Sequence, residues 1–547
     1  MVYVFVVNFV LNNYLIPGLA EKRPSVLRGD RLHVTPLPPV EFKYEGLVND
    51  TSHSNAYLVF DPRFEVDVGD VFNKVFRIEF TIQRLSLRLM HRAVEIMKSD
   101  QLYEDILFPQ SFNIRPMKPI NSFTLDCFEK SIEGNSEQIT AVRHIVAGSS
   151  RPAPYIIYGP PGTGKTFTLV EAIKQVCKVY PKSKILVCAP QNDAADIIAE
   201  RLLDHVSEKS ILRFNAASRN AQSMSDEILR ISNYNQVLNR VVFSPKSEIA
   251  KKQIVVSTLT NSGRLVSAEL NDHFTHLFID EAGFATEPET VIPLALLSPK
   301  LKMGGQLVLA GDPKQLGPIL RSALATLHGF DVSLLERLME APNSLYSRNQ
   351  DGFYNNKFVT KLLKNFRSHP EILEVPNQLF YEFELQPCAD KREREKLCGW
   401  QGLPEFSMYR WKFESIGFPL VFRQVTGREE QDRSSPSWFN RHEVLVVAEY
   451  VENLLYGSPR VDPLDIGIIS PYIQQVKKIR RALDIIGNDP RSSSISGDIR
   501  DIKVGSVEKF QGDEKEVIII STVRSQTDKL NIDEKFNLGF VRNPKPL

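Results

Sequence analysis

Residues 155–176 read YIIYGPPGTGKTFTLVEAIKQV, an apolar run, then a glycine-rich loop, then a stretch that is compatible with a helix. The loop fits the pattern GxxxxGK[ST] of phosphate-binding loops in the required strand-loop-helix context. Its glycines let backbone N–H groups wrap phosphates at a helix N-terminus, Lys165 supplies a positive charge to the β and γ phosphates, and the Thr166 hydroxyl reaches Mg²⁺. The predicted nucleotide contacts are Gly159, Pro160, Pro161, Gly162, Thr163, Gly164, Lys165 and Thr166.

Short apolar runs separated by helix-length stretches surround this loop. They are YIIY, KILVCAP, QIVVST, HLFIDE and GQLVLAGD, and a second series after about residue 346 contains PLVF, DIGIISP, IKVGSV and EVIIIST. Such alternation is typical of doubly wound parallel sheets. The sequence therefore predicts an α/β fold with two domains, 119–345 and 346–547, the first with a helical insertion near 205–250.

In the first 118 residues, the apolar residues are spaced differently. Residues 1–80 contain short strand-like runs between turn signals, such as AYLVF and KVFRIEFTI, which predict a small β-barrel. Within 81–118, a helix and linker, apolar residues recur every four positions at Leu85, Leu89, Ala93 and Met97. Arg84, Arg88 and Arg92 share another stripe of this helix. A solvated polar face is the favoured interpretation of that stripe, and contact with phosphates is the alternative.

Composition excludes several classes of protein. The chain has 547 residues, 42% of them apolar and 24% charged, which is typical of a soluble protein with three or four domains. Its net charge of +1 provides no bulk attraction to nucleic acid, so any such binding depends on local clustering. Five cysteines without a CxxC pair argue against a structural metal and a disulfide framework, and favour a reducing compartment.

The apolar start, MVYVFVVNFVL, is too short for a membrane span and lacks the basic region of a signal peptide. We expect a strand there, or the start of a longer parent chain, and no membrane association.

Three further stretches support a nucleotide site. HLFIDEAG places Asp280 and Glu281 at the end of a strand, where Asp280 can hold Mg²⁺ and Glu281 can polarise the attacking water. LVLAGDPKQLGP ends another strand and offers Gln315 to sense the γ-phosphate. Upstream, EGNSEQITAV contains Gln138, whose amide suits the hydrogen-bonding edge of adenine. Each stretch alone would be an ordinary cap or loop, but together with the phosphate-binding loop they predict hydrolysis of a nucleoside triphosphate.

The order of short motifs along the chain resembles that of a known protein family. GNSEQ, GPPGTGKT, APQNDAAD, STLTNSGRLVSA, DEAG, AGDPKQLGP, KNFRSHP, ISPYIQQV and GSVEKFQGDE follow one another as in superfamily-one helicases of the Upf-like group. Within that group the chain resembles the Moloney leukaemia virus ten and Armitage RNA-silencing helicases. The resemblance implies two RecA-like domains and an RNA-contacting β-barrel with stalk helices. It also implies an ATP-driven, 5′ to 3′ translocase on single-stranded RNA, in the cytoplasm or P-bodies, with roles in gene silencing and messenger-RNA turnover and with Argonaute proteins as partners.

The same resemblance assigns further residues. It implies that Phe366 stacks on adenine, that Arg367 reaches the γ-phosphate, and that Gln511 and Glu514 lie beside the nucleotide. The implied RNA contacts, mostly to phosphate and sugar, are Asn192, Thr258, Pro471, Tyr472 and Ser506. Alternatives remain at this point, since Phe366 would also suit a core and Ser506 a turn.

Some positions depart from the family pattern. Gln191 and Asp193 stand where serines are usual, and Ile473 stands where a basic residue is common, so we expect weaker contact with the RNA backbone. The final NPKPL has Pro546 where the family motif has an arginine, and the resemblance places the second catalytic arginine in a helix that begins near this motif. We therefore expect a chain shortened at both ends, with ATP binding less affected than hydrolysis. A hydrolysis-impaired RNA-binding adaptor is the alternative to an active helicase, and a DNA helicase is a third possibility.

Overall fold

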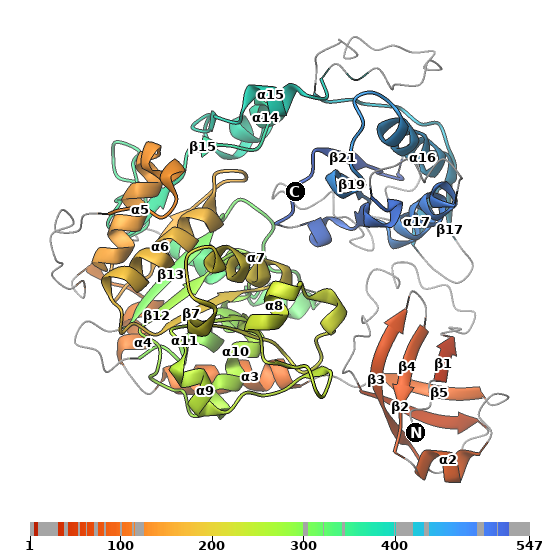
Figure 1. Cartoon of the computed structure of the whole chain (residues 1–547), viewed down its shortest axis with the longest axis horizontal. Helices are drawn as coiled ribbons and strands as arrows, with labels where there is room; N and C mark the ends of the chain where they lie inside the picture. Colours follow the sequence, from red (N-terminus) through yellow and green to blue (C-terminus); the bar gives the residue numbers. More distant parts are fainter. Residues whose placement is uncertain are drawn as a thin grey trace. The chain divides into compact units, whose positions relative to one another are not determined.

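The computed structural model describes residues 5–8, 31–37, 42–52, 55–61, 63–69, 75–80, 84–98, 101–111, 114, 125–298, 305–320, 322–341, 345–398, 400, 419–431, 437–488, 497–510 and 512–524. The chain divides into two compact units (Figure 1). The first comprises Met1–Val7, Val26–Arg367 and Leu379–Cys388, and the second comprises Asn8–Ser25, Ser368–Gln378 and Ala389–Leu547. The first unit thus continues beyond residue 345, where the sequence pattern places the boundary.

The N-terminal region forms a five-stranded sheet in the order β1-β4-β3-β2-β5. Its strands are β1 (Phe5–Asn8), β2 (Arg31–Leu37), β3 (Tyr44–Ser52), β4 (Asn55–Val59) and β5 (Val75–Phe80), with the short helix α2 at Arg63–Val68. Leu32 and Val34 alternate on the buried face of β2 and share it with Leu58 and Phe64. The predicted strands in this region are confirmed, including the one expected near the N-terminus.

The predicted helix after this sheet is also confirmed, as α3 (Leu85–Met97), followed by α4 (Gln101–Leu107). Leu89, Ala93 and Met97 are buried against the first α/β domain, as their spacing predicts. Arg92 donates hydrogen bonds to the Gly263 carbonyl and, at 3.0 Å, to Ser267 Oγ. At least one of the three stripe arginines therefore packs on the domain.

A seven-stranded, wholly parallel sheet forms the centre of the first unit, in the order β14-β6-β13-β12-β7-β11-β8. The strands are β6 (Tyr155–Tyr158), β7 (Ile185–Ala189), β8 (Ile211–Phe214), β11 (Ile254–Thr258), β12 (His276–Ile279), β13 (Gln306–Gly311) and β14 (Val359–Lys361). All five apolar runs quoted for this domain are strands of this sheet.

Both faces of the sheet are covered (Figure 1). Tyr155 and Ile157 of β6 pack under α5 (Ser136–Ala147), α6 (Lys165–Val179) and α7 (Asn192–Leu203). Ile156 and Tyr158 pack on the other face, with α3, α10 (Leu259–Ser267), α11 (Glu287–Leu294) and α13 (Leu334–Glu340). Burial on both faces explains why these strands are continuous apolar runs.

Three sequence-based expectations need correction. The segment near 205–250 is only partly helical, since it contributes β8 to the main sheet and adds α8 (Asp226–Ile231), a ribbon of β9 (Tyr234–Asn235) and β10 (Arg240–Val241), and α9 (Lys246–Lys251). Strand β14 lies beyond the predicted boundary at 345/346, yet it pairs with β6 of the first sheet. The run PLVF at 419–422 is not a strand, and Leu420, Val421 and Phe422 are exposed, so no core fixes it in a sheet.

The second unit contains a three-stranded parallel sheet in the order β20-β19-β21. Strands β19 (Ile466–Ile469), β20 (Lys503–Gly505) and β21 (Val517–Ile520) correspond to the other three quoted runs. The accompanying elements are α14 (Pro370–Phe380), α15 (Lys391–Glu395), α16 (Arg441–Tyr456), α17 (Ile473–Gly487), β17 (Glu429–Gln431) and β18 (Trp438–Asn440). The short strands β15 (Lys364–Asn365) and β16 (Gln386–Pro387) and the helix α12 (Ala323–Leu327) complete the first unit. Among the described helices, none combines the length and hydropathy that crossing a bilayer requires.

Candidate nucleotide and nucleic-acid sites

The glycine-rich loop joins β6 to α6, which begins at Lys165. Gly162 and Gly164 have φ angles of +72° and +79°, a region that side-chain-bearing residues adopt at a cost. The aliphatic chain of Lys165 lies directly over Gly159, where any β-carbon would collide with it. The loop therefore exposes backbone N–H groups at the N-terminus of α6, the arrangement that binds phosphate.

Two carboxylates lie beside this loop, at the end of β12. Thr166 Oγ1 donates a 2.6 Å hydrogen bond to Asp280 Oδ2, and Lys165 Nζ lies 3.7 Å from Glu281 Oε1. Burial, and secondarily the charge of Glu281, raise the pKa of Asp280 to about 6. The structure thus brings together Thr166 and Asp280, the predicted Mg²⁺ ligands, and Glu281, which is predicted to polarise the attacking water. A hydroxyl and a carboxylate in contact form an oxygen donor set that suits Mg²⁺.

Gln315 is held at the end of β13 by a buried carboxylate. Asp312 Oδ2 accepts hydrogen bonds from Gln315 Nε2 at 3.1 Å and from the Tyr381 hydroxyl at 2.8 Å. The Lys314 N–H donates to Asp312 Oδ1 at 2.9 Å. Burial raises the pKa of Asp312. Tyr381 was not predicted as a site residue, because it lies 69 residues after Asp312 in the sequence and no local pattern marks it.

The segment KNFRSHP is bound to the phosphate-binding loop through its backbone and one side chain. The Phe366 N–H donates to the Gly162 carbonyl at 2.8 Å, and Asn365 Nδ2 donates to the Pro161 carbonyl at 2.7 Å. Asn365 Oδ1 accepts the Arg367 N–H at 3.1 Å. Phe366 is 48% exposed, which is against a core role and leaves its ring accessible. Asn365 is fully buried and is a site residue that sequence reasoning missed.

Gln138 also reaches the loop. It lies in the first turn of α5, where the Asn135 side chain caps the helix by accepting the Gln138 N–H. Its Nε2 is 3.5 Å from the Thr163 carbonyl oxygen, and the residue is buried. The structure thus brings Gln138, Asp280, Glu281 and Arg367 close to the same eight-residue loop, all within the first unit.

The predicted RNA contacts lie at strand ends in both units. Asn192 begins α7 after β7, and Thr258 ends β11, the neighbour of β7, and occupies the N-cap position of α10. In the second unit, Pro471 and Tyr472 follow β19, and Ser506 follows its neighbour β20. Each set therefore lies at the carboxyl edge of its own sheet, where ligands of parallel sheets bind.

Two predicted residues of the second unit complete the set. Glu514 is exposed in the loop before β21. Gln511 lies outside the described residues. The backbone carbonyl of Ser506 accepts the Lys509 N–H at 3.1 Å, so Ser506 also begins a helical turn, as its alternative interpretation holds.

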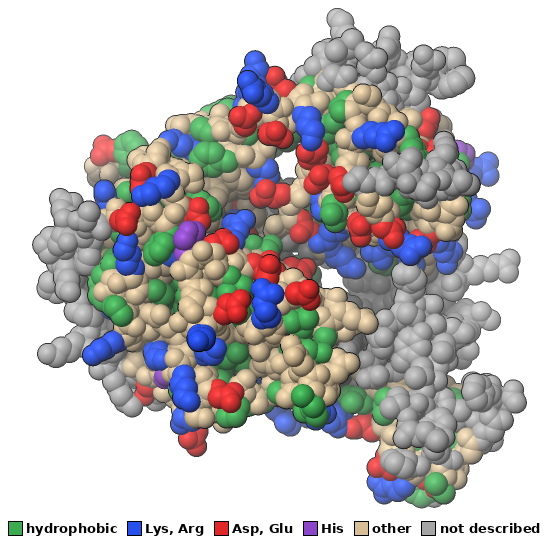
Figure 2. Space-filling view, viewed as in Figure 1, with side chains coloured by type: hydrophobic (Ala, Val, Ile, Leu, Met, Phe, Trp, Pro, Cys, Tyr) green, Lys and Arg blue, Asp and Glu red, His purple; other side chains and the backbone are tan. Residues whose placement is uncertain are grey.

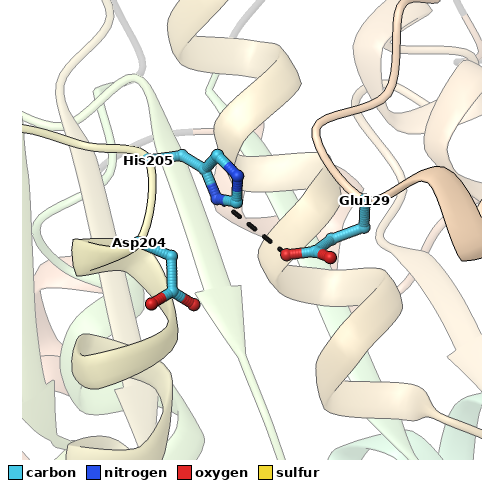
Figure 3. Close-up of side chains that lie close together, drawn as sticks. All are labelled: Glu129, Asp204 and His205. Atoms are coloured by element: carbon cyan, nitrogen blue, oxygen red, sulfur yellow. Dashed lines mark ion pairs between the residues drawn. The ribbon is translucent and has the colours of Figure 1, made fainter.

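A separate group of acidic and histidine side chains lies on the α6 side of the first unit. Figure 3 shows Glu129, Asp204 and His205, with His205 Nδ1 3.9 Å from Glu129 Oε1. The buried ammonium of Lys174 lies 2.7 Å from His205 Nδ1 and 3.5 Å from Glu129 Oε1. Because this ammonium already provides a cation between them, we assign the group to an ion-pair network.

Charge on the face drawn in Figure 2 is mixed, with lysine and arginine side chains interspersed among aspartate and glutamate. This distribution agrees with the net charge of +1. On this face, recognition of a polyanion would therefore rest on particular contacts rather than on a broad basic surface.

Sequence models of known families match most of the chain. The model "Helicase MOV-10, beta-barrel domain" matches residues 8–80, which agrees with the predicted barrel. Two models described as "AAA domain" match residues 133–243 with 215–323, and residues 330–547.

Curated relatives agree. The chain is 46% identical over 542 residues to "Putative helicase mov-10-B.2" of Danio rerio, covering 97% of this chain and 51% of the relative. It is 35% identical over 605 residues to "RNA helicase Mov10l1" of Homo sapiens and 33% identical over 590 residues to "Probable RNA helicase armi" of Drosophila melanogaster, covering 97% of this chain and 46% of each relative. The chain therefore spans about half the length of the curated relatives that it matches.

Proposed function

The chain belongs to the MOV-10 family of helicases, and from that premise we propose that it is the motor of an ATP-dependent RNA helicase. The observation that supports this most is the contact of Thr166 with Asp280 beside Lys165 and Glu281. These four side chains belong to two motifs that are more than 100 residues apart in sequence. Their convergence at one sheet edge is what phosphoryl transfer to water requires.

Each residue of the site has a proposed role. Thr166 and Asp280 would hold Mg²⁺, which would neutralise the developing charge on the transferred phosphate. Lys165 binds the β and γ phosphates, and Glu281 orients and polarises the attacking water. Gln315, fixed by Asp312, contacts the γ-phosphate. Arg367, held beside the loop through Asn365, stabilises its charge.

The nucleotide base and the second unit complete the proposal. Gln138 and Phe366 bind adenine, and Gln511 and Glu514 contribute from the second unit.

RNA is the proposed track, bound through Asn192, Thr258, Pro471, Tyr472 and Ser506. Two relatives carry RNA helicase in their names, and the likeness supports RNA over DNA. We further propose 5′ to 3′ movement and a role in RNA-mediated silencing and messenger-RNA turnover. The proposed partners are Argonaute proteins, in the cytoplasm or P-bodies.

Phosphate release from ATP, with and without single-stranded RNA, tests the enzyme. The wild type should show RNA-stimulated release, and Lys165→Ala should abolish it. Glu281→Gln should keep ATP affinity and lose turnover by about 10²- to 10⁴-fold, because only the water-activating group is removed. Turnover of the wild type at or below the Lys165→Ala level would reject the enzyme.

One sequence observation favours a second candidate, an RNA-binding adaptor that binds ATP without efficient hydrolysis. The resemblance places a second catalytic arginine in a helix that begins near residues 543–546, and Pro546 departs from that motif. Arginines that reach a transferred phosphate contribute about 10³- to 10⁵-fold to turnover. ATP-dependent RNA binding without phosphate release would identify the adaptor. Strand displacement on matched duplexes separates both from a DNA helicase, since faster unwinding of DNA would contradict an RNA track.

A further inference from the structure

A buried cluster of charged side chains lies beneath the N-terminus of α7. Arg213 of β8 is fully buried, and its Nε donates to Asp196 Oδ1 at 2.7 Å. Arg219 pairs with the same carboxylate and donates to Asn215 Oδ1 at 2.7 Å. One carboxylate thus faces two guanidinium groups. A charge buried in this way is stable only when its remaining donors also find acceptors.

Another acceptor of Arg213 is the side chain of Asn192. Arg213 Nη2 lies 3.0 Å from Asn192 Oδ1 and 3.4 Å from the Asn192 carbonyl oxygen. A guanidinium group has donors only, so the amide atom that faces it must be the oxygen. The amide nitrogen of Asn192 is then on the side away from Arg213. Since Asn192 is exposed, this nitrogen is presented as a fixed donor at the start of α7.

The same cluster extends to Ser257, the residue before Thr258, which is the second predicted RNA contact of this unit. Arg213 Nη1 donates to the Phe214 carbonyl at 3.2 Å. That carbonyl also accepts from Ser257 Oγ at 3.1 Å and from Asn261 Nδ2 at 2.9 Å. Ser257 precedes Thr258 in β11. The ends of β8 and β11 are therefore joined through the group that orients Asn192.

We propose that Arg213 is a positioning residue, which holds the Asn192 amide with its nitrogen outward so that it donates to a phosphate of the bound RNA strand. This inference rests on the proposed function, in which Asn192 contacts RNA. Phosphate oxygens only accept hydrogen bonds, so a side chain fixed as a donor suits them whatever the base. An unrestrained asparagine would present either amide atom and could also read base edges. The contact is accordingly independent of RNA sequence.

The donor is tested with Asn192→Asp. A carboxylate still accepts from Arg213, so the melting temperature should be maintained, but it has no N–H to donate. Affinity for a fluorescent single-stranded RNA should fall by about tenfold or more, and equally for uridine and adenosine strands. Asn192→Ala is the matched control, because it removes the same donor without adding a charge. A loss of RNA affinity in Asn192→Asp but not in Asn192→Ala would show charge repulsion and would overturn the proposal.

The role of Arg213 is tested with a double-mutant cycle. Arg213→Met should weaken RNA binding in the wild-type background and cause no further loss in an Asn192→Ala background, because both changes remove one contact. If Arg213→Met does not fold, Arg213→Lys replaces it, since a lysine keeps the charge but cannot serve Asp196 and Asn192 in one plane. An equal loss of RNA affinity in both backgrounds, or no loss in either, would show that Arg213 has only a structural role.

Neutral methylphosphonates, placed one at a time in the RNA, locate the contact. At one position, the methylphosphonate should weaken RNA binding by the wild type and leave RNA binding by Asn192→Ala unchanged. If no position behaves in this way, Asn192 does not contact a phosphate. Failure of the wild type to bind RNA at all would instead refute the proposed function. The two failures are therefore distinguishable.

Discussion

The Asn365 amide donates a 2.7 Å hydrogen bond to the Pro161 carbonyl, across more than 200 residues of sequence. Its oxygen accepts the Arg367 N–H, so one buried side chain joins the phosphate-binding loop to the segment that carries Phe366 and Arg367. The shape of the loop and the position of the arginine are therefore not independent.

Asn365→Asp should separate these two bonds. The carboxylate still accepts the Arg367 N–H, but it cannot donate to Pro161 and repels that carbonyl. We expect ATP affinity to fall by about tenfold, the value of one buried hydrogen bond with an unsatisfied partner. Fluorescent-nucleotide titration measures it. Asn365→Ala should lose both bonds and weaken ATP binding further, and equal affinities of all three proteins would show that Asn365 is only structural.

Tyr381→Phe should reduce turnover rather than ATP binding. Without its hydroxyl, Asp312 loses one of its three donors and holds Gln315 less firmly, so RNA-stimulated hydrolysis should fall by about tenfold. Tyr346→Phe is the matched control, because Tyr346 is equally buried and donates to the Pro154 carbonyl at 2.8 Å. It should lower the melting temperature without changing turnover. A similar rate loss in both variants would point to general destabilisation.

Gly162→Ala should damage the loop more than strain alone explains. A β-carbon at Gly162 would lie 2.7 Å from both Arg367 Cβ and Asn365 Nδ2. Gly352 has a comparable φ of +84° but open space around it. Both alanines should cost about 1 kcal/mol of backbone strain, and only Gly162→Ala should also reduce ATP affinity. Thermal unfolding and nucleotide titration of the two variants decide this.

His144 should make the first unit sensitive to acid. Its Nδ1 is buried with no hydrogen-bond partner among the described residues, and burial lowers its pKa to about 4. The unfolded chain therefore binds one more proton than the folded chain between about pH 6.5 and 4. Stability is fully present above that window and decreases as the pH falls through it, by up to about 1.4 kcal/mol per pH unit.

Melting temperatures at pH 7 and pH 5 measure this effect. His144→Phe should reduce the difference between the two temperatures. Replacement of the exposed His328 by glutamine should leave it unchanged. An unaltered difference in His144→Phe would assign the acid sensitivity to other groups.

Much of the fold follows from local pattern. YIIY, HLFIDE and DIGIISP are short apolar runs with turns on either side, and burial on both faces of a parallel sheet fixes such runs as strands. PLVF has the same composition, but its side chains are exposed. An apolar run specifies a strand only where neighbouring strands and helices cover it, and this information is not local.

Some residues of the site are likewise recognisable from local sequence, and others are not. Lys165, Thr166, Asp280 and Glu281 are recognisable because the chemistry requires those residue types next to glycines or at strand ends. Asn365 and Tyr381 carry no such signature, since an asparagine or a tyrosine suits many surroundings. Their importance lies in the distant carbonyl or carboxylate that each one meets.

The sequence by itself thus determined the two parallel sheets, the phosphate-binding loop and the order of the helicase motifs, because each depends on residues that are neighbours in the chain. Only the tertiary structure decided that β14 joins the first sheet, that Asn365 ties Arg367 to the loop, and that Arg213 orients Asn192. These relationships depend on which buried donors and acceptors meet after folding. A local sequence pattern does not determine which donor contacts which acceptor, because that depends on how the whole unit packs.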